Sequence, residues 1–260
     1  MLPYINFFGL EIQTYSIMAA IGFALTAIIS VKLGKNRNIP SEKSLLALLV
    51  SLVGIFAGGH FLFALTNMKE ISSLVSKGEF SLSSVMPYVS GMVFYGGLVG
   101  ATLALWIYTK LEPSVSKTDF FDVFAVSVPL FHTFGRVGCF FAGCCYGVES
   151  DFGFSSAFNT SALHYGVSRF PVALVEAFAN LLVFMLLLTL YKKDKFRDRL
   201  FFIYLSLYAP IRFVLEFFRG DEVRGFVFGL STSQFISLVI IIGLLIYTFI
   251  KFLRRSSKSK

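Results

Sequence analysis

The stretch from residue 233 to 253, SQFISLVIIIGLLIYTFIKFL, is almost entirely apolar and carries one charged side chain, Lys251. A helix of about 20 apolar residues matches the thickness of the hydrocarbon core of a bilayer. Within that core every backbone polar group must find its partner inside the segment, and a helix provides this. The stretch therefore predicts a transmembrane helix.

Comparable apolar runs precede this one, at 11–33, 43–66, 91–109, 119–134, 171–191 and 199–215. The run at 119–134 is the weakest, because it is short and contains Pro129 and His132. The 260-residue chain is 56% hydrophobic and 15% charged, whereas a soluble domain carries about 25% charged residues. We therefore predict an all-α membrane protein of about seven transmembrane helices, folded as a single domain over residues 1–260.

The net charge of +8 is unevenly distributed. Most of the 23 Lys and Arg residues lie at 32–43, 110–117, 192–199 and 251–260, which seven spans place on one side of the membrane. Basic residues near the ends of spans favour the cytoplasmic side. We therefore predict a cytoplasmic C-terminus and an N-terminus outside. The basic residues are interpreted as anchors against anionic lipid, so the bilayer is an expected partner and nucleic acid is not.

Two segments on the opposite side, 68–90 and 135–170, are longer than a helix connection requires. Four glycines lie between positions 135 and 147, and we expect them to break the helix and to let the backbone approach a ligand. Arg136 lies among apolar neighbours at the predicted membrane edge, where a guanidinium is costly unless it faces a polar cavity or an anion. An arginine that reaches the outer headgroups is the alternative, and the glycines favour a built site.

A second polar group lies near the end of the run at 199–215. Arg212 and Glu216 are four positions apart, so they share one helical face and can pair. Tyr208 lies one turn earlier on that face. In one interpretation the Arg212–Glu216 pair has a structural role only, because its two charges neutralise each other. In the other, Arg136 and Arg212 together form a phosphate clamp, because the planar fork of a guanidinium suits phosphate oxygens.

Three residues inside the spans are further candidates. Glu176, near the start of the run at 171–191, is an intramembrane carboxylate and therefore a functional candidate; it could also be the counter-ion of an arginine. His132 precedes Arg136 by one helical turn, so the two can share a cavity, although a merely hydrogen-bonded histidine is an equal alternative. In FYGGLVG at 94–100 the glycines favour close helix packing, and Tyr95 lies either at the membrane interface or pointing inward.

The chain has three cysteines, and all of them fall in the glycine-rich segment: Cys139, Cys144 and Cys145. Three interpretations remain open. The cysteines are small fillers of a tightly packed region, a redox centre, or, together with His132, a metal site. The spacing lacks both the Cys-x-x-Cys pair of thioredoxin-like proteins and the two matched pairs of a typical zinc site.

Motifs along nearly the whole chain resemble, in the right order, those of the prolipoprotein diacylglyceryl transferase family. GRVGCF at 135–140, followed by Gly147, resembles the family signature, as does FYGGLVG at 94–100. Tyr15 stands where the family has a Tyr-Gly pair. Further resemblances are PVALVE at 171–176, YAPIRFVLEFFRGD at 208–221 and GLSTSQFIS at 229–237.

The resemblance implies a bacterial plasma (inner) membrane enzyme with its active site towards the outer leaflet and with neither cofactor nor metal. Its substrates would be phosphatidylglycerol and the lipobox cysteine of a prolipoprotein signal peptide, joined in a thioether with release of glycerol phosphate. The implied catalytic residues are Arg136, Arg212, His132 and Tyr95. The implied substrate-binding residues are Tyr15, Gly96, Gly97, Gly138, Glu176, Tyr208, Glu216 and Gln234.

The chain departs from the family pattern at several positions. Tyr95 replaces a histidine, Cys139 an asparagine, Ala173 a glutamine and Val175 a tyrosine. Because the missing histidine is a candidate for activating the thiol, we hypothesise that His132 or Tyr95 supplies the base. The alternative is a divergent membrane enzyme that modifies another lipid or thiol, or a thiol-redox protein that uses the three cysteines. A transporter is disfavoured because the charges gather at the outer edge instead of at mid-membrane.

Overall fold

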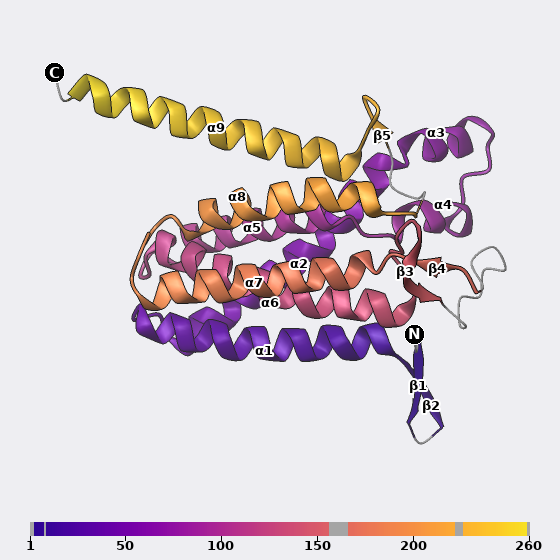
Figure 1. Cartoon of the computed structure of the whole chain (residues 1–260), viewed down its shortest axis with the longest axis horizontal. Coiled ribbons are helices and arrows are strands. Elements are labelled where there is room, and N and C mark those ends of the chain that lie inside the picture. Colours follow the sequence, from indigo (N-terminus) through magenta and orange to yellow (C-terminus); the bar gives the residue numbers. More distant parts are fainter. Residues whose placement is uncertain (1–2, 8, 156–165, 222–225, 259–260) are drawn as a thin grey trace. The chain divides into compact units, whose positions relative to one another are not determined.

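The computed structural model describes residues 3–7, 9–155, 166–221 and 226–258, which form mainly long helices (Figure 1). Six spans in these residues are long and apolar enough to cross a membrane. They are α1 (Thr14–Asn36), α2 (Ser41–Thr66), α6 (Lys117–Ala142), α7 (Val172–Lys192), α8 (Leu200–Leu215) continued by η1 (Glu216–Phe218), and α9 (Thr232–Lys258).

A seventh span is formed if α4 (Leu82–Val89) and α5 (Phe94–Leu111) are taken together, although the two meet at an angle of 87°. Helix α5 covers the predicted run at 91–109, and α3 (Met68–Ser76) lies with α4 in the predicted outer segment at 68–90. The prediction of an all-α membrane fold with about seven spanning helices is therefore confirmed. The orientation of the termini stays a prediction.

Short antiparallel strand pairs, which the sequence did not suggest, supplement the helices. The pairs are β1 (Tyr4–Phe7) with β2 (Leu10–Gln13), β3 (Glu149–Ser155) with β4 (Ser168–Arg169), and β5 (Phe226–Val227) with β6 (Leu230–Ser231). Between β5 and β6 the chain turns at Phe228 and Gly229, with φ values of 52° and 78°. Glycine adopts this left-handed conformation without steric cost.

Helix α6 is longer than the predicted run at 119–134, and the expectation that the glycines break it is wrong for the first two. The helix passes through Gly135 and Gly138 and ends at Ala142. A Cβ on Gly138 would lie 3.1 Å from Cδ2 of Tyr15, so this glycine serves the approach of α1. Gly143, with φ of 71°, then ends the helix.

The longer helix changes where the predicted outer segment begins. That segment starts at 143 instead of 135, and residues 156–165 of it lie outside the described part of the chain. His132, Arg136 and Cys139 are consequently all side chains of one helix. Their mutual spacing is fixed by helical geometry, which places residues three or four positions apart on one face.

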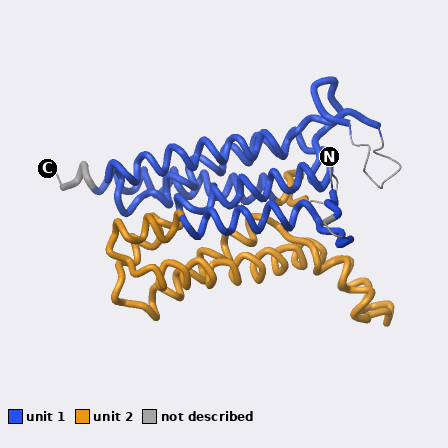
Figure 2. Tube along the Cα trace, turned by 90° about the horizontal axis from the view of Figure 1, so that it is seen from below, with its two compact units in different colours: residues 1–28, 125–223, 233–260 blue, residues 29–124, 224–232 orange. Residues whose placement is uncertain are grey.

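The chain divides into two compact units, which are coloured separately in Figure 2. Unit 1 comprises residues 1–28, 125–223 and 233–260, and unit 2 comprises residues 29–124 and 224–232. Unit 1 contains most of α6 together with α7, α8 and α9. Unit 2 contains α2 to α5.

Within unit 2, α2 and α5 pack through two glycine pairs with the small-xxx-small spacing of close membrane helices. A Cβ on Gly100 of α5 would lie 2.1 Å from the carbonyl oxygen of Gly54, and one on Gly96 would lie 2.3 Å from that of Gly58. No side chain fits at these distances, so glycine is required at both positions. The prediction that the glycines of 94–100 serve helix packing is confirmed.

Candidate active site

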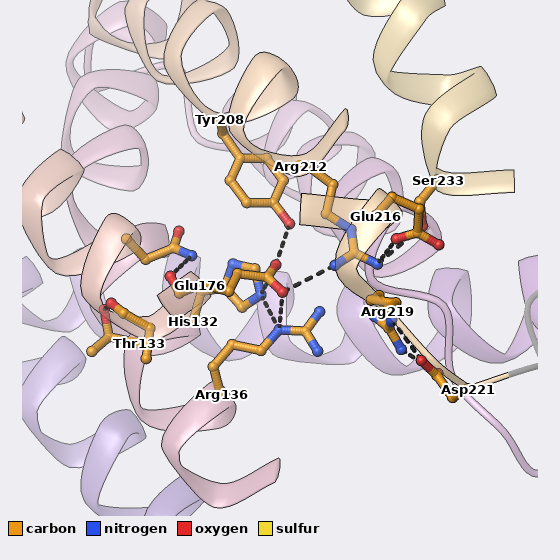
Figure 3. A network of polar contacts seen from close by, with 12 residues as sticks. His132, Thr133, Arg136, Glu176, Tyr208, Arg212, Glu216, Arg219, Asp221 and Ser233 are labelled. Carbon is orange, nitrogen blue, oxygen red and sulfur yellow. Dashed lines mark hydrogen bonds and ion pairs between the residues drawn. The ribbon is translucent and has the colours of Figure 1, made fainter. Parts of the chain in front are cut away.

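The carboxylate of Glu176 is the centre of a polar cluster in unit 1 (Figure 3). Glu176 lies in the second turn of α7 and is 1% exposed. Its Oε2 accepts a hydrogen bond from Nη1 of Arg212 at 2.9 Å and lies 3.1 Å from Nε of Arg136. One carboxylate oxygen is therefore shared by arginines from two different helices, α6 and α8.

The other oxygen of Glu176 contacts an aromatic residue from each of the same two helices. Oε1 accepts a hydrogen bond from the Tyr208 hydroxyl at 3.1 Å and lies 3.5 Å from Nε2 of His132. The His132 and Tyr208 rings meet edge to face, with centroids 5.3 Å apart. Each aromatic residue lies four positions before an arginine on its own helix, so both pairs present one face to Glu176.

Charge is compensated within the cluster. Arg212 pairs with Glu216 at 2.7 Å between Nη2 and Oε2, as the four-residue spacing predicted. Arg136 and Arg212 thus face two carboxylates, those of Glu176 and Glu216. An unpaired charge in an apolar interior is strongly destabilising, so each of these groups depends on the others. Glu176 is the counter-ion of both Arg136 and Arg212, whereas the sequence predicted that it would pair with one arginine.

The two arginines differ in which of their nitrogens are occupied. In Arg212, Nη1 is bound to Glu176, and Nη2 is bound to Glu216 and, at 3.2 Å, to the Ser233 hydroxyl. Arg136 makes its contacts through Nε, which lies 3.1 Å from Nε2 of His132 and from Glu176. Among the described residues none accepts a hydrogen bond from the Nη atoms of Arg136, which point away from Glu176 in Figure 3.

Arg136 therefore presents a guanidinium fork that the described residues leave available. Its side chain is 9% exposed, compared with 4% for Arg212. Two parallel N–H groups of a guanidinium match two oxygens of a phosphate or carboxylate. Since Nε donates a hydrogen bond to His132 and forms an ion pair with Glu176, the orientation of the fork is fixed before any anion arrives. The geometry suits an oxyanion site.

The other predicted site residues lie in several places. Gly138 packs against Tyr15 of α1, which is 42% exposed. Gln234 is buried at the start of α9, next to Ser233. Tyr95, Gly96 and Gly97 belong to unit 2, where Tyr95 is 1% exposed. The cluster itself brings together His132, Arg136, Glu176, Tyr208, Arg212 and Glu216.

Sequence reasoning missed the contacts of three residues in or near the cluster. Ser233 contacts Arg212 from α9, and the only signal for it was its position beside Gln234 in GLSTSQFIS. Arg219 and Asp221 form a bidentate pair, with Nε and Oδ1 2.9 Å apart. Both lie in the predicted motif at 208–221, but their spacing of two residues gave no reason to expect a contact after the helix.

Replacing Glu176 by Gln should strongly destabilise the protein, because two buried guanidinium groups would lose their shared counter-ion. Breaking a buried ion pair costs about 3–5 kcal/mol. The measurement is the thermal unfolding of the detergent-solubilised protein. Glu149→Gln is the matched control, since the Glu149 side chain is 74% exposed and pairs with Arg169 at 3.6 Å, and an exposed pair contributes about 0–1 kcal/mol. Equal stabilities of the two variants would contradict the central role of Glu176.

Comparison with known proteins agrees with the motifs. The family model described as "Prolipoprotein diacylglyceryl transferase" matches residues 3–250. A phosphatidylglycerol–prolipoprotein diacylglyceryl transferase of Clostridium tetani is 31% identical over 247 residues, covering 94% of this chain and 96% of the relative. A Clostridium perfringens protein with this name and the number 2 is 30% identical, covering 91% and 90%.

A third relative of the same name, from Chlorobaculum tepidum, is 32% identical over 260 residues and covers 92% of this chain and 87% of the relative. These similarities extend over nearly the full length of both partners, and the matched region includes all the helices that carry the Glu176 cluster. The chain belongs to the prolipoprotein diacylglyceryl transferase family.

Proposed function

We propose that this multi-pass membrane protein transfers the diacylglyceryl group of phosphatidylglycerol to the lipobox cysteine thiol of prolipoproteins. Family membership and the names of the relatives support this assignment. The observation that carries it within the chain is the guanidinium of Arg136, which Glu176 holds by Nε and which keeps its fork available. A phospholipid offers its phosphate diester as the matching anion.

The reaction joins a thiol to a glyceryl carbon. A base takes the proton of the substrate thiol, and the sulfur attacks the glyceryl carbon that bears the phosphate ester. The carbon–oxygen bond breaks with its electron pair on the phosphate oxygen, so that a thioether forms and glycerol phosphate leaves. Negative charge grows on the departing phosphate, and preorganised cations aimed at that charge lower the barrier.

Arg136 is the residue suited to bind the phosphate. Arg212 acts as a positioning residue, because Glu176, Glu216 and Ser233 occupy its terminal nitrogens. It holds the Glu176 carboxylate, which in turn holds Arg136. This arrangement fixes the geometry before the substrate arrives, which reduces the entropy lost on reaching the transition state.

His132 is placed beside the same group and is suited to act as the base. Its Nε2 is unprotonated, because it accepts a hydrogen bond from Nε of Arg136 at 3.1 Å, and it can take the thiol proton once that bond is broken. The base for the thiol must carry a lone pair within reach of the proton. Tyr95 stays the second candidate.

The cluster is further proposed to lie towards the outer leaflet. Along α7, Glu176 and Lys192 are separated by roughly 24 Å at 1.5 Å per residue, which is most of the thickness of the hydrocarbon core. The basic residues of 192–199 thus lie at the opposite end of α7 from the cluster. Since basic residues favour the cytoplasmic side, the cluster belongs on the other side.

Arg136→Ala should abolish transferase activity, and Arg136→Lys should not restore it, because an ammonium lacks the planar fork. The expected loss is at least about 100-fold, as for the removal of one preorganised donor. The assay follows conversion of a lipobox peptide to its thioether with phosphatidylglycerol by mass spectrometry, beside rescue of cells depleted of their own transferase. Arg197→Ala, in the exposed segment after α7, is the control and should keep activity.

Two outcomes would overturn the assignment. Activity of Arg136→Ala equal to wild type would remove Arg136 from the reaction. Failure of the wild-type chain to rescue the depleted cells or to modify the peptide would favour the alternative, a divergent enzyme that acts on another lipid or thiol.

Removing the base should lower activity about 100-fold to 10,000-fold near neutral pH. Activity of the variant should recover as the pH rises, because a substrate thiol with a pKa of about 8.5 ionises unaided. His132→Ala and Tyr95→Phe are to be compared over a pH series, with Tyr88→Phe of α4 as the control. A loss that is constant across pH would identify a positioning role, and full activity of both variants would refute the hypothesis.

The proposed orientation is tested with the protein's own cysteines. In intact spheroplasts, a membrane-impermeant maleimide should label a C139S/C145S variant, whose remaining cysteine is the exposed Cys144. Addition of Cys144→Ser should remove the label. Lys193→Cys in a background without the native cysteines should react after lysis alone. The reverse pattern would place the cluster on the cytoplasmic side.

A further inference from the structure

All three cysteines of the chain converge just beyond the proposed phosphate site. Their Sγ atoms lie within 4.8 Å of one another. Cys139 is buried in the last turn of α6, Cys145 is partly buried and Cys144 is exposed, and none of them is in a disulfide. A cluster of thiols that opens to the surface differs from a set of small core fillers, all of which would be buried.

The backbone that positions the thiols is unusual. After Gly143, with φ of 71°, Cys145 also has a positive φ, of 56°. For a residue other than glycine, asparagine or aspartate this left-handed conformation is uncommon, and it persists where its surroundings hold it. The turn brings the sulfurs of two adjacent cysteines to that of Cys139, which precedes them on α6.

The residues that follow the turn hold it in place. The Val148 N–H donates to the Phe218 carbonyl at 3.0 Å, and the Gly220 N–H donates to the Tyr146 carbonyl at 3.0 Å. On the other edge, the Phe170 N–H donates to the Val148 carbonyl at 2.9 Å. Residues 146–148 are thus fixed between two other segments of unit 1, so the cysteines occupy a built site.

Positive charge lies close to this site, because Arg136 and Arg219 both act on the Cys145 sulfur. The thiolate is the form of cysteine that binds metals. A negatively charged metal–thiolate group would be stabilised by the same two arginines.

We propose that Cys139, Cys144 and Cys145 form a three-thiolate site for one thiophilic d10 metal ion, Zn²⁺ or Cu⁺. Thiolates are soft ligands that select these ions. Three sulfurs at about 2.3 Å from a central ion lie roughly 4 Å apart, so the present separations need small adjustments only. A disulfide would use two of the sulfurs and leave the third unexplained. The proposal departs from the expectation of no metal.

The test uses the full-length protein, purified in detergent under reducing conditions and freed of metal by a chelator. Cd²⁺ is the spectroscopic probe, because cadmium–thiolate bonds give a charge-transfer absorption. We expect saturation at one equivalent, and displacement by Zn²⁺ or Cu⁺, added separately, identifies which ion the site prefers. Since thiols lose their protons on binding, affinity should increase with pH.

Single variants Cys139→Ser, Cys144→Ser and Cys145→Ser should each weaken Cd²⁺ binding at least about 10-fold, and the triple variant should lose the charge-transfer band. Because Cys144 is exposed, Cys144→Ser is expected to fold, and a metal-dependent rise in melting temperature, present in wild type and absent in this variant, is a second measurement. His60→Ala is the control for adventitious binding, since His60 lies in unit 2 and contacts the Gly91 carbonyl.

Three results would refute the proposal: no charge-transfer band in the wild type, equal binding by the triple serine variant, or a stable disulfide between two of the cysteines in membranes isolated without reductant. None of these measurements depends on transferase activity, so the metal site and the proposed function succeed or fail separately.

Discussion

The buried carboxylate of Glu176 is the constraint on which the polar part of this protein depends. It lies among apolar helices with 1% of its surface exposed, and a charge in such surroundings is tolerated only when it is paired and hydrogen-bonded. Two arginines, a tyrosine and a histidine meet that requirement from α6 and α8. The Glu176 carboxylate on α7 requires positive charge and hydrogen-bond donors around it. This requirement determines which residues of α6 and α8 face it.

The same constraint gives the arginines different roles. Arg212 contacts Glu176, Glu216 and Ser233 through its two terminal nitrogens. Among the residues that the structure describes, Arg136 is contacted at Nε, by Glu176 and His132, and its terminal nitrogens have no hydrogen-bond partner there. In the proposed function, Arg136 therefore binds the phosphate without first breaking its ion pair with Glu176.

Backbone hydrogen bonds beyond the helices reinforce this arrangement. Val148 bonds to Phe218 at the end of η1 and to Phe170 just before α7, and its own segment begins where α6 ends. The three helices that carry Arg136, Glu176 and Arg212 are thus connected at the ends nearest the cluster. The cysteine turn belongs to the same connection, so a metal bound there would stabilise the end of the helix that carries Arg136.

The sequence by itself determined the spanning helices, because hydropathy over about 20 residues reflects the cost of placing polar groups in lipid. It also determined the Arg212–Glu216 pair and the glycine contacts of α5, which depend on local helical spacing. Only the tertiary structure decided that α6 continues through Gly138, that Glu176 serves both arginines, and that three thiols meet after a left-handed turn. These features depend on the relative rotation of helices and on contacts between distant segments. The periodicity of a short stretch of sequence contains no information about either.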